Sequence, residues 1–215
     1  MIELIDDYTV FPSLDLISRE GIIAFGGKLT KNRLIEAYSK GIFPWYNAED
    51  PVIWWCPDPR FVLFPEKLHI SKHMKKLLKK APYSVTFNRC FTEVMRQCAV
   101  VLRKGQEGTW IHSEMIEAYT ELHHMGIAQS VEVWEGEELI GGLYGVKMGK
   151  VFCGESMFSK RDNASQYGFI SFLQSNSDIR LVDCQVYSDY LSRLGAEEIA
   201  RERFLELLEV YNSTC

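Results

Sequence analysis

Apolar residues recur with a helical period in several segments of the chain. Residues 30–41 show this pattern: Thr30 stands where an N-cap is expected, the apolar side chains fall on one side, and Gly41 follows the last turn. By the same argument, Ser71 and Asn163 are expected to cap two further helices. The full set of predicted helices covers residues 30–41, 71–80, 89–102, 113–125, 163–175 and 200–211.

Segments rich in β-branched and aromatic residues predict strands between these helices. They cover residues 83–88, 129–134, 139–148, 151–158 and 180–187. Short connections join the three middle segments, one at residues 135–138 and one at Gly149-Lys150. Because turns of this length connect antiparallel neighbours, we expect an antiparallel meander over residues 129–158.

The first 60 residues have a different texture, rich in aromatic residues, glycine and proline. "GIFPWY" occupies residues 41–46, and "VIWWCPDPR" occupies residues 52–60. Proline fixes its own backbone and restricts the residue before it, so the prolines on either side of Asp58 exclude regular structure there. We therefore expect a small aromatic-lined unit that leads into a linker.

Composition and charge restrict the class of protein. The chain has 215 residues, of which 47% are hydrophobic and 25% charged, as in a soluble protein with one large domain or with one domain and a small companion. The net charge of −5 does not indicate a nucleic-acid partner for the molecule as a whole. The six cysteines lack C-x-x-C and zinc spacings, and no leader or transmembrane run is present. We therefore expect a cytoplasmic protein with reduced thiols and no metal.

One predicted helix concentrates positive charge. At 100° per residue, the apolar side chains of residues 71–80 fall opposite an arc of five lysines: Lys72, Lys75, Lys76, Lys79 and Lys80. The segment from Lys67 to Lys80 contains no acidic residue, although the chain as a whole is acidic. Two interpretations stay open, a solvated surface helix and a surface that contacts a phosphate backbone.

Polar residues interrupt two of the predicted strands. Glu155 follows Gly154 in an apolar segment, where a carboxylate is costly to bury unless it is paired or used. Asp183 and Gln185 stand two apart in "LVDCQV", so their side chains are expected on one face of a strand, with the residue between them on the other. They are either satisfied surface groups or part of a polar site that faces Glu155.

These residue types favour one kind of chemistry. The sequence shows no nucleophile elbow, no Ser-His-Asp arrangement and no Walker loop. Two carboxylates, an amide, many aromatic residues and a lysine-rich helix suit acyl transfer from an already activated donor. An aminoacyl ester on tRNA is such a donor, because its transfer needs a deprotonated amine, a pocket for the acyl side chain and hydrogen-bond donors for the oxyanion.

Ten short motifs resemble those of the bacterial leucyl/phenylalanyl-tRNA–protein transferases, in the same order and over nearly the whole chain. They are "GIFPWY", "WWCPDPR", "LHISKHMKK", "GTWI", "AYTELHHMGIAQSVEVW", "GGLYGV", "FCGESMFS", "NAS", "DCQ" and "LGAEEI". The resemblance implies an α+β protein with a small N-terminal domain at residues 1–62. At residues 63–215 it implies a catalytic domain with the acyl-CoA N-acyltransferase (GNAT) fold and a mixed, largely antiparallel sheet.

The resemblance also implies an activity. It predicts transfer of Leu, Phe or Met from aminoacyl-tRNA to the N-terminal Arg or Lys of a protein, which marks that protein for degradation. It further implies an enzyme without a cofactor or a membrane partner, acting as a monomer in the cytoplasm.

The residues carried over by motif fall into four groups. Trp45 and Trp110 resemble the aromatic pair that holds the terminal adenosine of tRNA, and the lysine-rich helix resembles the acceptor-stem contact. Glu155, Asp183 and Gln185 resemble the site at the reacting carbonyl and amine. The acyl side-chain pocket is expected from Leu143, Phe152, Met157, Phe172 and Val182, for which plain core packing is the alternative.

The sequence leaves the route of the proton open. Gln185 is expected to orient the incoming amine while Asp183 polarises it or anchors its cation, or else the tRNA ribose 2′-hydroxyl carries the proton. The chain departs from the family at Gln166-Tyr167-Gly168 and in the "SNSD" loop at residues 175–178, which puts the acyl-chain preference in doubt.

Two alternatives belong to other functional classes. An acetyl-CoA-dependent N-acetyltransferase shares the implied fold, but it binds pyrophosphate with a glycine-rich turn, and "SKRDNAS" at residues 159–165 has no glycine. A non-catalytic tRNA-binding module needs only the lysine-rich helix and the aromatic residues. That alternative leaves Glu155, Asp183 and Gln185 unexplained.

Overall fold

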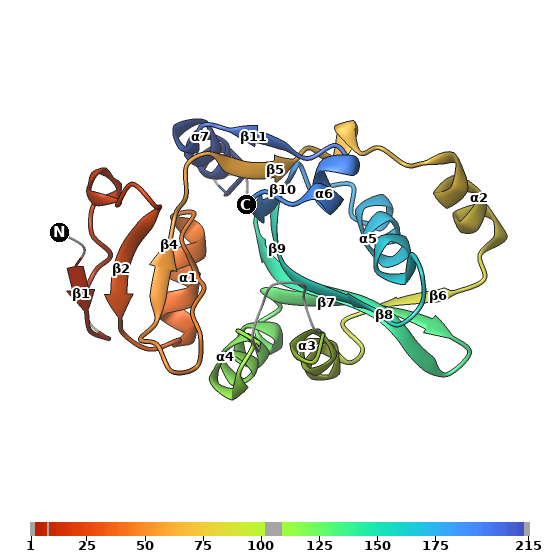
Figure 1. Cartoon of the computed structure of the whole chain (residues 1–215), viewed down its shortest axis with the longest axis horizontal. Coiled ribbons are helices and arrows are strands. Elements are labelled where there is room, and N and C mark those ends of the chain that lie inside the picture. The colour runs from red at the N-terminus through yellow and green to blue at the C-terminus, as the bar shows by residue number, and fades with distance from the viewer. Residues whose placement is uncertain (1–2, 8, 102–108, 213–215) are drawn as a thin grey trace.

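Two β-sheets organise the computed structural model, which describes residues 3–7, 9–101 and 109–212 (Figure 1). The smaller sheet has the strand order β1 (Glu3–Ile5), β2 (Ile22–Gly26), β4 (Ile53–Trp55) and β3 (Phe43–Pro44). The larger sheet has the order β11 (Glu197–Ile199), β5 (Arg60–Leu63), β10 (Leu181–Gln185), β9 (Val151–Ser159), β8 (Glu138–Met148), β7 (Ala128–Glu135) and β6 (Ser84–Phe87). Strands and helices are thus mixed throughout, and the predicted α+β class is confirmed.

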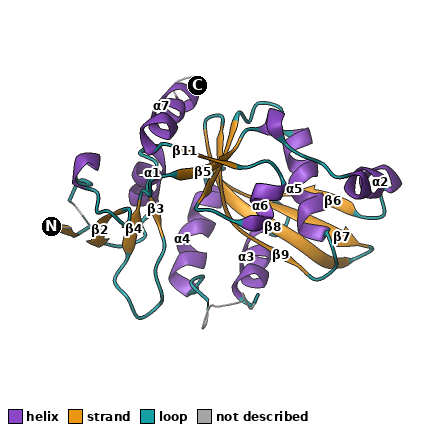
Figure 2. Ribbon diagram, turned by 45° about the horizontal axis from the view of Figure 1, so that its top comes forward, coloured by secondary structure: helices purple, strands orange, loops and turns teal. Residues whose placement is uncertain are grey.

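Helices cover both faces of the larger sheet (Figures 1 and 2). One face carries α3 (Phe91–Ala99) and α4 (Ser113–His124), and the other carries α5 (Ala164–Ser175). The remaining helical elements are α1 (Lys31–Ser39), α2 (Lys72–Lys80), α6 (Asp189–Arg193), α7 (Arg201–Asn212) and the 3₁₀ turns η1 (Leu14–Leu16) and η2 (Pro65–Lys67). Within the described ranges, none of these helices has the length and apolar character to cross a membrane.

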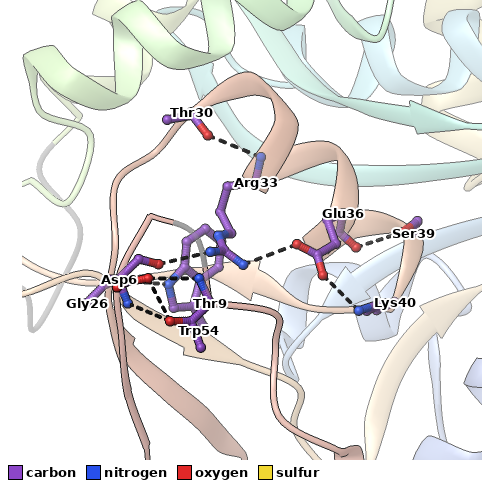
Figure 3. Close-up of polar contacts among 9 residues, drawn as sticks. All are labelled: Asp6, Thr9, Gly26, Thr30, Arg33, Glu36, Ser39, Lys40 and Trp54. Carbon is purple, nitrogen blue, oxygen red and sulfur yellow. Dashed lines mark hydrogen bonds and ion pairs between the residues drawn. The ribbon is translucent and has the colours of Figure 1, made fainter.

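Helix α1 is fixed to the smaller sheet by a polar cluster (Figure 3). The Thr30 side chain accepts a hydrogen bond from the Arg33 backbone N–H, which confirms the predicted N-cap. The buried Arg33 guanidinium donates to the carbonyl oxygen of Asp6 at 3.0 Å and forms an ion pair with Glu36. Because α1 also contacts α4 and β8, this cluster holds one side of α1 while its other side meets the larger sheet.

The meander predicted over residues 129–158 is present as β7, β8 and β9, which pair antiparallel in sequence order. Its two turns contain Gly136 and Gly149, with φ angles of 61° and 55°, in the left-handed region that glycine enters without strain. Beyond the meander, β9 pairs with β10 in parallel, and β10 pairs with β5 antiparallel. The larger sheet is therefore mixed and largely antiparallel, as predicted.

The predicted linker after the aromatic-rich segment is wrong in part. Residues 56–59 lack regular structure, as the prolines imply, but Arg60 begins strand β5. This strand lies inside the larger sheet, between β11 and β10. Its four residues are all buried, and Phe61 and Val62 pair with both neighbouring strands. The chain therefore passes from the smaller sheet to the larger one between Trp55 and Arg60. The domain boundary at residues 62 and 63 stays a prediction.

Asn163 occupies the predicted N-cap position of α5, but its side chain does not act as the cap. Asn163 has a φ of 66° and its side chain makes no capping hydrogen bond. The hydroxyl oxygen of Ser159 instead accepts from the backbone N–H of Ser165, at 2.8 Å. The end of β9 thus supplies the side-chain cap for α5.

Helix α2 lies at the end of the molecule away from the smaller sheet (Figures 1 and 2). Ser71 caps it through the Met74 N–H, as predicted, and Met74 is buried against Tyr167 and Ile170 of α5. The opposite face is exposed and presents Lys72, Lys75, Lys76, Lys79 and Lys80. Tyr167, in the segment 166–168 that departs from the resembled motif, therefore belongs to the buried cluster that supports α2.

Candidate active site

A cavity of about 370 Å³ opens between the end of the smaller sheet and the centre of the larger one. Its apolar wall comes from β8, β9, β10 and α5, and its other side includes Phe43, Pro44 and Trp45. The polar groups on its lining include Glu155, Asp183 and Gln185, and the described lining contains no lysine or arginine. The cavity thus combines a mainly apolar interior with a few converging polar side chains, as ligand sites do.

The parallel pair of β9 and β10 makes room for this cavity. Their pairing runs from Leu181 opposite Val151 to Asp183 opposite Cys153. Just beyond it, the register of β10 shifts between Asp183 and Gln185, and Gln185 takes a φ of 66°. A bulge of this kind bends the strand and redirects its side chains. Cys184 and Gln185, which follow the last β9–β10 pair, therefore line the cavity, although Gln185 still pairs with Phe61 of β5.

The bulge changes the alternation that the sequence predicts for this strand. Asp183 and Gln185 both line the cavity, but so does Cys184, which was expected on the opposite face. That part of the prediction is wrong because strict alternation requires an unbroken strand.

Glu155 stands at the centre of the polar groups and is 8% exposed. Its Oε1 atom accepts hydrogen bonds from Tyr38 Oη at 2.7 Å and from Gln185 Nε2 at 2.9 Å. The predicted proximity of Glu155 to Gln185 is therefore present. Tyr38 comes from α1, so the smaller sheet's helix contributes directly to the site, and a hydrogen bond of 2.5 Å joins its hydroxyl to that of Tyr119 on α4.

Burial raises the pKa of Glu155 to about 8. The charge of Asp183 acts in the same direction, whereas the hydrogen bonds from Tyr38 and Gln185 and the charge of Arg60 lower the pKa. The carboxyl group is consequently poised to exchange a proton near neutral pH, a property that clusters at functional sites.

Asp183 is 1% exposed and is committed to Arg60. Arg60 Nε donates to Asp183 Oδ1 at 2.8 Å, and Arg60 Nη2 donates to Oδ2 at 2.6 Å, which makes a bidentate pair. The Gln185 backbone N–H also donates to Oδ1, at 3.0 Å. Asp183 therefore fixes the backbone at the bulge that presents Gln185.

The guanidinium of Arg60 is held by two aromatic rings as well as by Asp183. Its Cζ atom lies 4.9 Å from the centre of the Phe43 ring and 4.4 Å from that of Phe204. Phe43 belongs to β3 and Phe204 to α7, so Arg60 links both sheets to the site. Sequence reasoning missed Arg60. Two features of the sequence could have indicated Arg60. An aspartate in an apolar strand needs a cationic partner when it is buried, and the "WWCPDPR" motif ends in an arginine.

Comparison with protein-family models shows which family the sequence matches. A family model described as leucyl/phenylalanyl-tRNA protein transferase matches residues 62–209. The chain belongs to this family. A second model, for the N-terminal domain of the same family, matches residues 27–58. The chain is accordingly an acyltransferase, as the resemblance predicted.

Curated relatives agree over nearly the full length of the transferase. A relative from Flavobacterium johnsoniae is 52% identical over 201 residues, which cover 93% of this chain and 95% of the relative. A relative from Cellvibrio japonicus is 50% identical, with 97% of this chain and 90% of the relative covered. Both carry the name leucyl/phenylalanyl-tRNA–protein transferase.

Solved structures resemble the transferase only weakly. One is a GCN5-related N-acetyltransferase from Kribbella flavida, with a TM-score of 0.38 and 10% identity, over 77% of this chain and 60% of that one. Another is L-PGS from Bacillus licheniformis, with a TM-score of 0.42 and 11% identity, over 86% of this chain and 63% of that one. Overlaps of this extent carry no argument about activity.

The expected aromatic pair of the transferase lies at the cavity. Trp45 is 37% exposed, and its ring centre lies 5.9 Å from that of Trp55. Trp55 Nε1 donates to the Trp45 carbonyl oxygen at 2.7 Å, which steadies the segment that carries the exposed ring. Trp110 is 8% exposed and also lines the cavity, on the α4 side.

Four of the five residues expected in the acyl pocket line the cavity: Leu143, Phe152, Met157 and Val182. Phe172 does not. Its ring packs behind Phe152, with 4.6 Å between the two ring centres. Phe169, one turn earlier on α5, lines the cavity in its place. The helical period put Phe169 on the same face of α5 and was the available signal for it.

Proposed function

We propose that the protein transfers Leu, Phe or Met from aminoacyl-tRNA to the α-amino group of proteins that begin with Arg or Lys, and so creates a degradation signal. We assign this action to a cytoplasmic monomer. The family relationship supports the aminoacyl-tRNA donor, since the relatives carry it in their name. The observation that carries the proposal is the Glu155–Gln185 pair at the end of an apolar cavity.

The apolar end of the cavity suits the side chain of the transferred amino acid. It is lined by aromatic, aliphatic and thioether groups, from Leu143, Phe152, Met157, Phe169 and Val182. Met157 has an unbranched, adaptable side chain, which accommodates acyl groups of different shape. A pocket of this composition accepts leucyl, phenylalanyl and methionyl groups and excludes charged ones, because burying an unpaired charge is costly.

The tRNA makes two further contacts in this proposal. Its terminal adenosine stacks on Trp45 and Trp110, which suits aromatic rings at the border of the cavity. Its acceptor stem contacts the lysines of α2, whose exposed side chains form no ion pair in the described parts of the chain. Lys67, just before the helix, pairs with Glu197 and does not join this surface.

The reaction replaces an ester bond with an amide bond. The neutral α-amine of the acceptor attacks the carbonyl carbon of the aminoacyl ester, a C–N bond forms, and the carbonyl oxygen becomes an oxyanion. Collapse of this intermediate breaks the C–O bond to the terminal ribose. The amine gives up a proton and the ribose oxygen gains one, so the products are the extended protein and free tRNA.

In this proposal Gln185 orients the amine and Glu155 takes up its proton. Because Gln185 Nε2 donates to Glu155, the Gln185 side-chain oxygen is the atom that accepts a hydrogen bond from the incoming amine. The pKa of Glu155, about 8, lies close to that of an α-amino group, about 7.7–8.0. Proton transfer from the α-ammonium to Glu155 is therefore nearly balanced in free energy. Asp183 acts through the backbone of Gln185, because Arg60 occupies its side chain.

A direct transfer assay tests the proposal. Purified protein is incubated with labelled Leu-tRNA and a peptide that begins with Arg, and the label in the peptide is measured. The account predicts transfer, which a peptide with an acetylated N-terminus abolishes. Binding of acetyl-CoA by calorimetry, without transfer from tRNA, would instead support an acetyl-CoA-dependent N-acetyltransferase. Binding of tRNA without any transfer would support a non-catalytic tRNA-binding module.

A further inference from the structure

The mouth of the cavity has two sides of different character. Trp45 stands on the side of the smaller sheet, where we place the donor adenosine. The other side is built by the residues that follow Gln185 in the chain, and it presents Val186 and Tyr187, which are 42% and 57% exposed. Large apolar side chains exposed at a cavity mouth mark a place where a ligand contacts the protein.

The carboxylates inside the cavity are already engaged. Arg60 holds both oxygens of Asp183. Glu155 Oε1 accepts two hydrogen bonds, one from Tyr38 Oη and one from Gln185 Nε2. A cationic side chain that enters the cavity therefore needs a different carboxylate.

Asp189 provides such a carboxylate next to Tyr187, which lines the cavity, although Asp189 is not itself among the described lining residues. It is exposed, and its Oδ1 accepts a hydrogen bond from Tyr187 Oη at 2.8 Å. No cation pairs with Asp189 in the ranges that the structure describes. The Tyr187 ring leans on Phe61, with ring centres 5.3 Å apart, so the aromatic face and the carboxylate are held side by side. The hydrogen bond to Asp189 and the charges of Asp189 and Glu198 all raise the pKa of Tyr187, which indicates negative potential here.

We propose that Tyr187 and Asp189 bind the cationic side chain of the acceptor's first residue. This inference rests on the proposed function and names the groups that select its acceptor. The Tyr187 ring offers a cation–π surface, and the Asp189 carboxylate offers an ion pair that a guanidinium can fill with two hydrogen bonds. An acceptor whose amine meets Gln185 places its first side chain beside the residues that follow Gln185, which are Tyr187 and Asp189.

The test compares charged and neutral acceptors of the same shape. Peptides that begin with Arg, Lys or citrulline are used with Leu-tRNA, because citrulline keeps the shape of arginine without its charge. Asp189→Asn is expected to lower kcat/KM for the Arg and Lys peptides by about fivefold through the acceptor KM, and to leave the citrulline peptide unchanged. Tyr187→Leu keeps an apolar side chain but removes the aromatic ring, so it should also lower kcat/KM for the Arg and Lys peptides.

Glu202→Gln is the matched control, since it removes one exposed carboxylate from α7 and leaves the cavity lining intact. This variant should leave kcat/KM unchanged with all three peptides. The thermal unfolding of all variants should match that of the wild type. If Asp189→Asn lowered kcat/KM equally with the Arg and citrulline peptides, or lowered it with neither, the inference would be overturned. Absence of transfer by the wild-type protein would refute the proposed function itself, and equal use of Arg and citrulline peptides by the wild type would refute its acceptor class.

Discussion

The lysine face of α2 and the polar centre of the cavity both depend on charge, but in opposite surroundings. The five lysines of α2 are exposed, and water and salt screen their interactions. Arg60 and Asp183 are each 1% exposed, so bulk solvent screens their interaction far less. The comparison teaches that the charge on α2 is exposed and available to a partner, whereas the charge in the cavity is buried and fixes geometry.

The two regions also differ in how many elements build them. The lysine face is one helix, and its nine residues carry both the exposed charges and the buried anchor Met74. The polar centre of the cavity joins Tyr38 from α1, Arg60 from β5, Glu155 from β9 and Gln185 from β10. Damage to α2 should therefore remain local, while damage to the centre should affect both sheets.

The largest effect is expected from breaking the buried pair. Arg60→Met leaves the Asp183 carboxylate buried without its partner, so the free energy of unfolding should fall by about 3–5 kcal/mol in urea titrations. Lys72→Met, the control on the exposed helix, should change it by less than about 0.5 kcal/mol. If both variants lowered the free energy of unfolding by a similarly small amount, the two regions would not differ in the electrostatic way described.

A double variant sharpens this result. Arg60→Met combined with Asp183→Leu removes both charges, and should recover most of the lost stability because an apolar pair of similar volume replaces an ion pair. Transfer should stay low, since the Gln185 backbone N–H no longer has its acceptor. Recovery of full transfer would mean that Asp183 does not position Gln185.

The next effect concerns the lysine face. Replacing Lys72, Lys75, Lys76 and Lys79 with alanine should weaken tRNA binding and flatten its salt dependence, by about 0.9 in the logarithmic slope for each phosphate that the lysines no longer neutralise. Transfer from a minimal aminoacyl-adenosine donor should be unchanged, because that donor has no stem. If the variant lost transfer activity equally with both donors, the lysines of α2 would not be the contact for the acceptor stem.

A smaller effect is expected from Tyr38, which connects α1 to the polar centre. Tyr38→Phe removes the hydrogen bond that favours the ionised Glu155 and also the bond to the Tyr119 hydroxyl, so the free energy of unfolding should fall by about 1–3 kcal/mol. The pKa of Glu155 should rise further, and the pH at which kcat/KM reaches half of its maximum should rise with it. Tyr46→Phe is the matched control, since the buried Tyr46 Oη has no hydrogen-bond partner in the described structure. Identical pH profiles for the two variants would contradict the link to Glu155.

Local patterns in the sequence predict the parts of the fold that one element builds. The lysine face follows from the helical period, and the meander follows from three strands joined by two glycine turns. The short strands of the smaller sheet escaped prediction, because β1, β3 and β4 have only two or three residues each and show no alternation. Their pairing depends on partners elsewhere in the chain.

The site could be predicted only in part for the same reason. Motif resemblance named Glu155, Asp183 and Gln185, and alternation along the strand placed the last two near each other. Arg60 and Tyr38 reach the site from 123 and 117 residues away in sequence, and no local pattern reports such contacts. The bulge at Gln185 likewise depends on how β10 pairs with β5.

The central claim is that Glu155 accepts the proton of the acceptor's amine. Glu155→Gln keeps the shape of the protonated side chain and its contacts with Tyr38 and Gln185 but cannot take up a proton. The measurement is kcat for transfer to an Arg peptide, taken together with the unfolding free energy of both proteins from pH 4 to 9.

The pH dependence of stability has a definite sign. The folded pKa of about 8 lies above the ordinary value of 4.5, so the folded state keeps a proton that the unfolded state releases. Wild-type stability relative to Glu155→Gln is highest below pH 4.5 and falls by up to about 1.4 kcal/mol per pH unit until about pH 8. The account predicts a variant at least as stable as the wild type at neutral pH, with kcat at least about tenfold lower. A destabilised variant with full kcat per folded molecule would contradict it.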